Sequence, residues 1–271
     1  MDKNDLSPLR MKYLNQKRNT KIMIHVIRII ILVLIIGLWE SLTASGILNP
    51  FIFSSPSRIL KTVGNLSASG QLEEHIATSL IETVAGFILG TAAGIVIAVI
   101  LWWNPAVSKI MDPYLVVLNA LPKTALGPIF IVCMGAGTGS IIAMTLAISL
   151  IVTILNVLNG FNHTAPEKIR LMKALGAGRL QIFLKLVLPA NLSTMVNVFK
   201  VNIGLSWVGV ITGEFLVSKA GLGYLIVYGS QVFKMDLVMT SVVILALCAA
   251  IMHIIIGFIE KIVRKRFGIQ K

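Results

Sequence analysis

Six long apolar runs divide this chain, and few folds can accommodate them. They cover residues 23–42, 79–103, 113–134, 140–158, 192–216 and 237–259. Each run is close to or above the roughly 18 residues that mark a membrane-spanning helix. Because 56% of the residues are hydrophobic, 13% are charged and the mean hydropathy is +0.88, an ordinary soluble domain is excluded. The sequence therefore predicts an all-α polytopic membrane protein with about six transmembrane helices.

The distribution of Lys and Arg predicts the orientation, since cytoplasmic loops carry an excess of both. Basic residues concentrate before the first run, in the loop at 164–189 and after the last run. We therefore expect both termini and this loop in the cytoplasm. The net charge of +13 mostly follows from this topology. The charges lie next to spans without interleaved aromatic residues, so nucleic acid is not expected as a partner.

The runs and charges predict one membrane domain without a separate soluble domain. In the third run, Asn119, Pro122, Lys123 and Pro128 either kink the helix or break it into two segments. The expected division is a cytoplasmic tail (1–21), a first transmembrane helix with an external loop (22–78), a core transmembrane domain (79–262) with a cytoplasmic loop (159–190), and a basic cytoplasmic tail (263–271).

Residues 164–189, called the basic loop below, have the pattern of two short helices. Thr164 and Glu167 have capping-box spacing and Pro166 suits a first turn, so we expect a helix to begin at Thr164. Gly176 predicts a left-handed stop, and Pro189 the end of a second amphipathic helix. The apolar residues of that helix are Leu180, Phe183, Leu184 and Val187. Periodicity alone fits both a helix pair on the lipid surface and a docking site for a soluble partner.

The spacing of Gly176, Ala177, Phe183, Leu188 and Pro189 resembles the "EAA" loop of ABC importer permeases. The position of the loop before the last two spans is also similar to that family. Two further segments, LPKTALGPIFIVCMGAG and GEFLVSKAGLGYLIVYGSQVF, resemble stretches of the permeases for nitrate, sulfonates and taurine. Together they extend the resemblance over most of the chain after Ser79.

This resemblance implies the MetI-like core of type I importer permeases, in the plasma membrane of a prokaryote. Two copies of the chain would enclose a solute pathway, a separate subunit would bind and hydrolyse ATP, and an external binding protein would deliver the solute. The chain itself would hold no cofactor and catalyse no reaction. The implied solute is a small anion or a sulfonate-like compound. A stand-alone secondary transporter or channel is the alternative, which the sparse membrane charges and the partner-like loop disfavour.

The resemblance also makes the basic loop a coupling element that docks on the ATPase subunit. The residues expected to take part are Glu167, Arg170, Ala174, Gly176, Ala177 and Phe183. The chain has Arg-Leu-Met at 170–172 where the family has Glu-Ala-Ala, so the resemblance does not imply the usual acidic contact, and the charge chemistry of docking stays open. Two roles are open for Phe183: an anchor in the partner's groove, or a core residue that holds the loop against the spans.

Four polar residues in the apolar runs are candidates for the pathway: Lys200, Asn156, Asn202 and Ser206. A charge at Lys200 is costly inside a membrane, so we expect it to face the bundle interior. It could attract an anionic solute, or it could form a structural ion pair, with Glu82 and Glu214 as possible partners. The polar side chains could equally form hydrogen bonds between helices.

Small residues at Gly86, Gly90 and Gly94 recur at four-residue spacing, which favours close packing of two helices. The two cysteines, Cys133 and Cys248, both lie in apolar runs, and the histidines are scattered. Neither pattern predicts a metal site or a disulfide. A membrane-embedded enzyme is not expected either, because no nucleophile with a base, His motif or paired carboxylates is recognisable.

Overall fold

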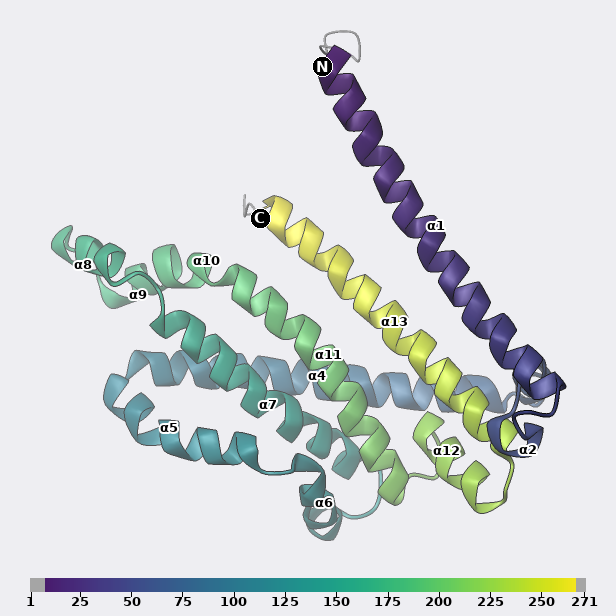
Figure 1. The fold of residues 1–271 in the computed structure, drawn as a ribbon. Helices are drawn as coiled ribbons and strands as arrows, with labels where there is room; N and C mark the ends of the chain where they lie inside the picture. The colour runs from purple at the N-terminus through teal and green to yellow at the C-terminus, as the bar shows by residue number, and fades with distance from the viewer. Residues whose placement is uncertain (1–7, 267–271) are drawn as a thin grey trace.

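The computed structural model describes residues 8–266, and the regular structure in this range is helical (Figure 1). Five helices are long and apolar enough to cross a membrane: α1 (Pro8–Ala44), α4 (Gln71–Trp103), α7 (Thr138–Asn162), α11 (Leu192–Val217) and α13 (Met235–Arg266). In α1 the candidate span is Gln16–Ala44, and in α13 it is Met235–Ile262. The predicted all-α polytopic fold is confirmed.

The third apolar run is broken, as its sequence indicates. Helix α5 (Pro105–Ala120) is followed by a 3-10 turn (Lys123–Leu126) and α6 (Gly127–Met134), and the two parts meet at 90°. Leu121 is extended (φ −64°, ψ 138°) because a residue before proline avoids the helical region. The run therefore forms either a broken sixth span or a re-entrant segment.

The core is built on the crossing of α4 and α7, against which α11 also packs. Glycines of α4 face hydroxyl side chains of α7, and the facing pairs are Gly86 with Thr145, Gly90 with Ser149 and Gly94 with Thr153. A Cβ atom at Gly90 would lie 1.9 Å from Ser149 Oγ and 3.2 Å from the Leu146 backbone. The close helix packing predicted from the glycine spacing is therefore confirmed.

The segment between the first two spans contains two helices that the sequence analysis did not identify, α2 (Pro50–Phe53) and α3 (Pro56–Ala68). Their first residues are prolines, and each follows a capping side chain. Asn49 Oδ1 accepts from Phe51 N–H at 2.9 Å, and Ser55 Oγ accepts from Arg58 N–H at 3.4 Å. The sequence signals for these two helix starts are the dipeptides Asn49-Pro50 and Ser55-Pro56.

The two ends of the bundle are built differently (Figure 1). One end carries the basic loop with α8 (Pro166–Ala174), and the other carries α2 and α12 (Leu222–Gln231). Helix α1 stands apart along most of its length and contacts α2 and α3. Its exposed apolar side chains suit contact with lipid. Helix α1 already begins within the predicted tail at 1–21, whereas residues 1–7 and 267–271 of the two predicted tails lie outside the described residues.

Candidate functional site

The basic loop folds into short helices beside the C-terminal ends of α4 and α7. After α8 come α9 (Arg179–Ile182), a π-helical turn (Phe183–Val187) and α10 (Leu188–Ala190). The two predicted amphipathic segments are confirmed, although the second is interrupted by the π-helical turn. It ends at Ala190, one residue beyond the predicted end at Pro189.

The predicted capping box at Thr164 and Glu167 is wrong. Helix α8 begins at Pro166, its N-cap is Ala165, and no side chain caps it. The hydroxyl of Thr164 is buried and instead accepts a hydrogen bond from Asn191 Nδ2 at 2.9 Å. A partner 27 positions away has displaced the local cap, so Thr164 ties the start of the loop to its end.

Gly176 makes the turn between the two halves of the loop, as predicted. Its φ is +78°, in the left-handed region that favours glycine. Gly176 N–H donates to Lys173 O and Ala177 N–H donates to Met172 O, both at 3.0 Å. This bond pair is a Schellman motif, which ends α8 and sets the direction of α9.

Phe183 lies in an aromatic cluster that joins the loop to the spans. Its ring centroid is 5.2 Å from Trp102, 5.6 Å from Phe161 and 6.1 Å from Trp103. Phe183 is 7% exposed and Phe161 is fully buried. Of the two roles open for Phe183, the structure therefore supports the core residue that holds the loop against α4 and α7.

Arg179 makes a second contact with α4, which sequence reasoning missed. Its guanidinium carbon lies 5.7 Å from the Trp102 ring centroid and 5.8 Å from that of Trp103, and its Nη2 donates to Trp102 O at 3.3 Å. The sequence offered no signal beyond a basic residue after Gly178, because 77 positions separate Arg179 from Trp102.

Most of the other predicted coupling residues are exposed on the surface of the loop. Glu167, Arg170 and Ala174 are exposed, and Gly176 and Ala177 form the turn beside them. In α8 and directly after it, two apolar side chains share this exposure: Leu171 is 60% exposed and Leu175 is 77% exposed. The loop thus presents a mixed basic and apolar surface on a backbone fixed by the turn and the aromatic cluster.

The four predicted pathway residues do not form one site. Asn202 is fully buried, and its Nδ2 donates to Thr91 Oγ1 (2.9 Å) and Thr153 Oγ1 (2.6 Å). Ser206 is buried as well. Asn202 therefore forms the hydrogen bonds between helices that the sequence analysis held open, linking α11 to α4 and α7. Asn156 is exposed on α7 and borders a polar hollow of about 460 Å³ with Asn159.

Lys200 forms an ion pair with Glu260, which joins α11 to α13. Glu82 and Glu214, the partners considered from the sequence, are the wrong residues. Both are buried and adjacent to each other at the end of the bundle opposite the basic loop. Glu260 lies two residues before the end of the candidate span in α13, whereas Lys200 is the ninth residue of the candidate span in α11.

Glu214 is the centre of a buried polar cluster that holds α12. Its Oε1 accepts from Ser79 Oγ–H and its Oε2 accepts from Gly223 N–H, both at 2.5 Å. Gly221 N–H donates to His75 Nδ1 at 3.0 Å. A Cβ atom at Gly221 would lie 2.4 Å from the Glu214 carboxylate, so the close approach depends on glycine. Side chains of α4 and α11 therefore fix the start of α12.

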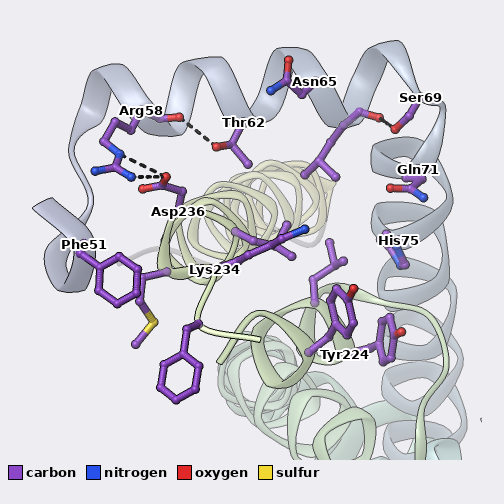
Figure 2. A pocket seen from close by; sticks show the side chains of 16 residues that line it. Phe51, Arg58, Thr62, Asn65, Ser69, Gln71, His75, Tyr224, Lys234 and Asp236 are labelled. Atoms are coloured by element: carbon purple, nitrogen blue, oxygen red, sulfur yellow. Dashed lines mark hydrogen bonds and ion pairs between the residues drawn. The ribbon is translucent and has the colours of Figure 1, made fainter. Parts of the chain in front are cut away.

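A polar hollow of about 810 Å³ opens at the same end, between α3, α4, α12 and the start of α13 (Figure 2). Arg58 on α3 donates to Asp236 Oδ2 from Nη2 (2.7 Å) and Nε (3.1 Å) and so connects α3 to α13. Tyr224 and Tyr228 stack with centroids 5.8 Å apart, and Figure 2 shows Lys234 extending across the hollow. Within the described residues, no group of His, Cys, Asp and Glu side chains could hold a metal ion.

The structure is a bundle of membrane-spanning helices. It carries the basic loop at one end and the polar cluster around Glu214 at the other, an arrangement that suits a membrane transport subunit. The chain belongs to the family of binding-protein-dependent transport system inner membrane components, whose sequence model matches residues 90–269. The resemblance to ABC importer permeases drawn from the basic loop is thereby confirmed.

Relatives of known name agree with this assignment. The chain is 24% identical to the putative aliphatic sulfonates transport permease protein SsuC of Bacillus subtilis, over 84% of this chain and 82% of that protein. It is 22% identical to the taurine transport system permease protein TauC of Escherichia coli, over 82% and 83%. It is 28% identical to the formylaminopyrimidine transport permease protein ThiX of Halalkalibacterium halodurans, over 69% and 74%.

A solved structure has a similar fold. The methionine ABC transporter MetNI in an inward-facing conformation contains a chain that superposes with a TM-score of 0.60 at 19% identity. The superposition covers 71% of this chain and 94% of the other. The predicted MetI-like core is therefore confirmed at the level of the fold.

Proposed function

We propose that this permease forms half of the solute pathway of an ATP-driven importer, as one of two identical copies, and that its basic loop docks on a separate ATPase subunit. The chain contributes no catalysis, because ATP would be bound and hydrolysed by that partner. Both termini would lie in the cytoplasm with the basic loop, as the distribution of Lys and Arg indicates.

The geometry of the basic loop carries this proposal. A coupling element has to transmit movement, so it needs a fixed backbone and an exposed surface. The Schellman turn at Gly176 and the buried ring of Phe183 fix the backbone. Leu171 and Leu175 remain exposed, and exposed apolar side chains beside charged ones are typical of a protein contact.

The proposed solute is a small anion or a sulfonate-like compound. Support comes from the relatives named for aliphatic sulfonates and taurine. Asn156 is the predicted pathway residue that best suits contact with such a solute, because it is exposed beside the polar hollow on α7. Lys200 suits it less, since its charge is already balanced by Glu260.

An external binding protein would deliver the solute at the end of the bundle that carries α12. The polar hollow beside Tyr224 and Lys234 is the part of that end best shaped to receive side chains of another protein (Figure 2). The Arg58–Asp236 ion pair gives the rim of the hollow a defined shape.

Site-specific photo-crosslinking tests the proposed docking. A photoreactive residue at Leu175 should form an adduct with the ATPase subunit co-expressed from the same transport system, identified by its mass. The matched control is Leu60 on α3, which is 73% exposed at the other end. Adducts with the ATPase subunit from Leu60 and none from Leu175 would show that a different surface docks.

A further inference from the structure

A basic groove of about 650 Å³ lies between the basic loop and the junction of α4 and α5. Three of the residues that line it are cations, Lys109 on α5, Lys173 on α8 and Arg179 on α9, and Trp102 and Asn162 lie beside them. None of the lining residues is acidic. Asp112, one turn along α5 from Lys109, borders a neighbouring hollow that Lys109 also lines.

The three cations are available to a ligand. All three are exposed, and none forms an ion pair with a carboxylate in the described part of the chain. Arg179 is held in place from behind by the rings of Trp102 and Trp103. One of its five N–H groups is bonded to Trp102 O, which leaves the others for an oxyanion. A fixed guanidinium loses little freedom when it binds a phosphate.

The groove lies at the level of a membrane surface. Trp102 and Trp103 are the last residues of the α4 span, where indole rings commonly sit among lipid headgroups. Lys109 belongs to the first turns of α5, which continues into the apolar part of the broken span. Val107 (38% exposed) and Ile110 (63% exposed) flank it. The groove thus combines cations at headgroup level with exposed apolar side chains next to them.

We propose that the basic groove binds the phosphate-bearing headgroup of an anionic phospholipid, one for each copy of the chain, with the acyl chains along α5. A phosphate diester can accept hydrogen bonds from several cations at once. Basic pockets between helices on the cytoplasmic side are suited to such headgroups. An acidic segment of a protein would match the charge but would leave the exposed side chains of α5 without a partner. The proposal goes beyond the transport function and does not depend on ATPase docking.

Native mass spectrometry of the full chain tests this, after release from bilayer nanodiscs that contain equal amounts of phosphatidylglycerol and phosphatidylcholine. The unmodified chain should retain phosphatidylglycerol in preference to phosphatidylcholine. The variant with Lys109→Gln, Lys173→Gln and Arg179→Gln should lose this preference, because each cation contributes about fivefold to the affinity. If the triple variant does not fold, Lys109→Gln alone serves as the test, because it changes an exposed position. It should reduce the preference about fivefold.

The matched control replaces Lys61, Lys168 and Lys185, which lie outside the groove, by Gln. It has the same net charge as the groove variant and should keep the preference. Three results would overturn the proposal: an unchanged preference in both groove variants, an equal loss in the control, or displacement of the lipid by inorganic phosphate at low millimolar concentration. A further test adds the ATPase subunit in detergent without added lipid and labels Lys109 chemically. If the ATPase subunit protects Lys109 from the label, the groove is a protein contact and the proposal is overturned.

Discussion

The two ends of the bundle are held by different forces. At the end with the basic loop, the rings of Phe183, Trp102 and Phe161 pack together and Arg179 lies over the indoles. At the end with α12, the Glu214 carboxylate accepts hydrogen bonds from a hydroxyl and a backbone amide. Aromatic packing tolerates small rotations, whereas a buried carboxylate requires its donors at fixed positions.

This difference indicates what each end can do. The basic loop is held to α4 mainly by aromatic contacts, with one side-chain hydrogen bond from Arg179 to Trp102 O. The start of α12 is bound more rigidly, through polar groups that are costly to leave unpaired inside a membrane. The α4–α7 crossing, with Gly90 against Ser149, connects the two ends as a rigid unit.

The largest effect is expected at the aromatic end. Phe183→Ala should lower the free energy of unfolding by about 3–5 kcal/mol, because it removes a buried ring. Leu184→Ala is the matched control, since Leu184 is 51% exposed, and should change it by less than about 0.5 kcal/mol. Chemical unfolding in detergent measures both. Equal losses of stability in the two variants would contradict the core role of Phe183. Loss of ATPase binding in Phe183→Ala with unchanged stability would instead support its role as an anchor in the partner's groove.

At the polar end, Glu214→Ala should cost about 2–3 kcal/mol, because Ser79 Oγ–H and Gly223 N–H lose their buried acceptor. Hydrogen exchange should accelerate in the first turn of α12 more than in the basic loop. Glu74→Ala, at an exposed position on the same face of the membrane, is the control. Acceleration spread evenly over both ends would show that they are not held independently.

The smallest effect is expected for the Lys200–Glu260 ion pair between α11 and α13. Lys200→Met should cost about 1–2 kcal/mol, less than for a fully buried pair because 31% of the Lys200 side chain is exposed. Adding Glu260→Gln should recover part of this stability and leave solute uptake intact. If the double variant is stable but does not take up solute, Lys200 belongs to the pathway instead.

Patterns within one helix or turn could be predicted from the sequence. The apolar runs correspond to α1, α4, α7, α11 and α13 with a broken pair between, and Gly176 adopts the predicted left-handed turn. The glycine spacing on α4 also predicted its close packing. These features depend on neighbours a few residues away, which periodicity and backbone preference describe well.

Contacts between distant segments could not be predicted. Thr164 has the spacing of a cap, but Asn191 competes for its hydroxyl. Ser79 and Glu214 are 135 positions apart, and Lys200 pairs with a residue of the last helix rather than with Glu214. In each case several polar residues could have been partners, and helix packing selected one of them.

One pair of variants tests directly whether the shape of the basic loop couples this permease to an ATPase subunit, as we propose. Gly176 and Gly178 both have open space where a Cβ atom would lie, so valine fits sterically at either. They differ in backbone conformation, since φ is +78° at Gly176 and −67° at Gly178. Valine disfavours only the first, by about 1–2 kcal/mol or more.

Retention of the ATPase subunit during purification, together with solute uptake, is the measurement. We expect Gly176→Val to lose both and Gly178→Val to keep both, while Gly176→Asn is intermediate because asparagine tolerates the left-handed region. Full retention and uptake in Gly176→Val would contradict the coupling role of the loop.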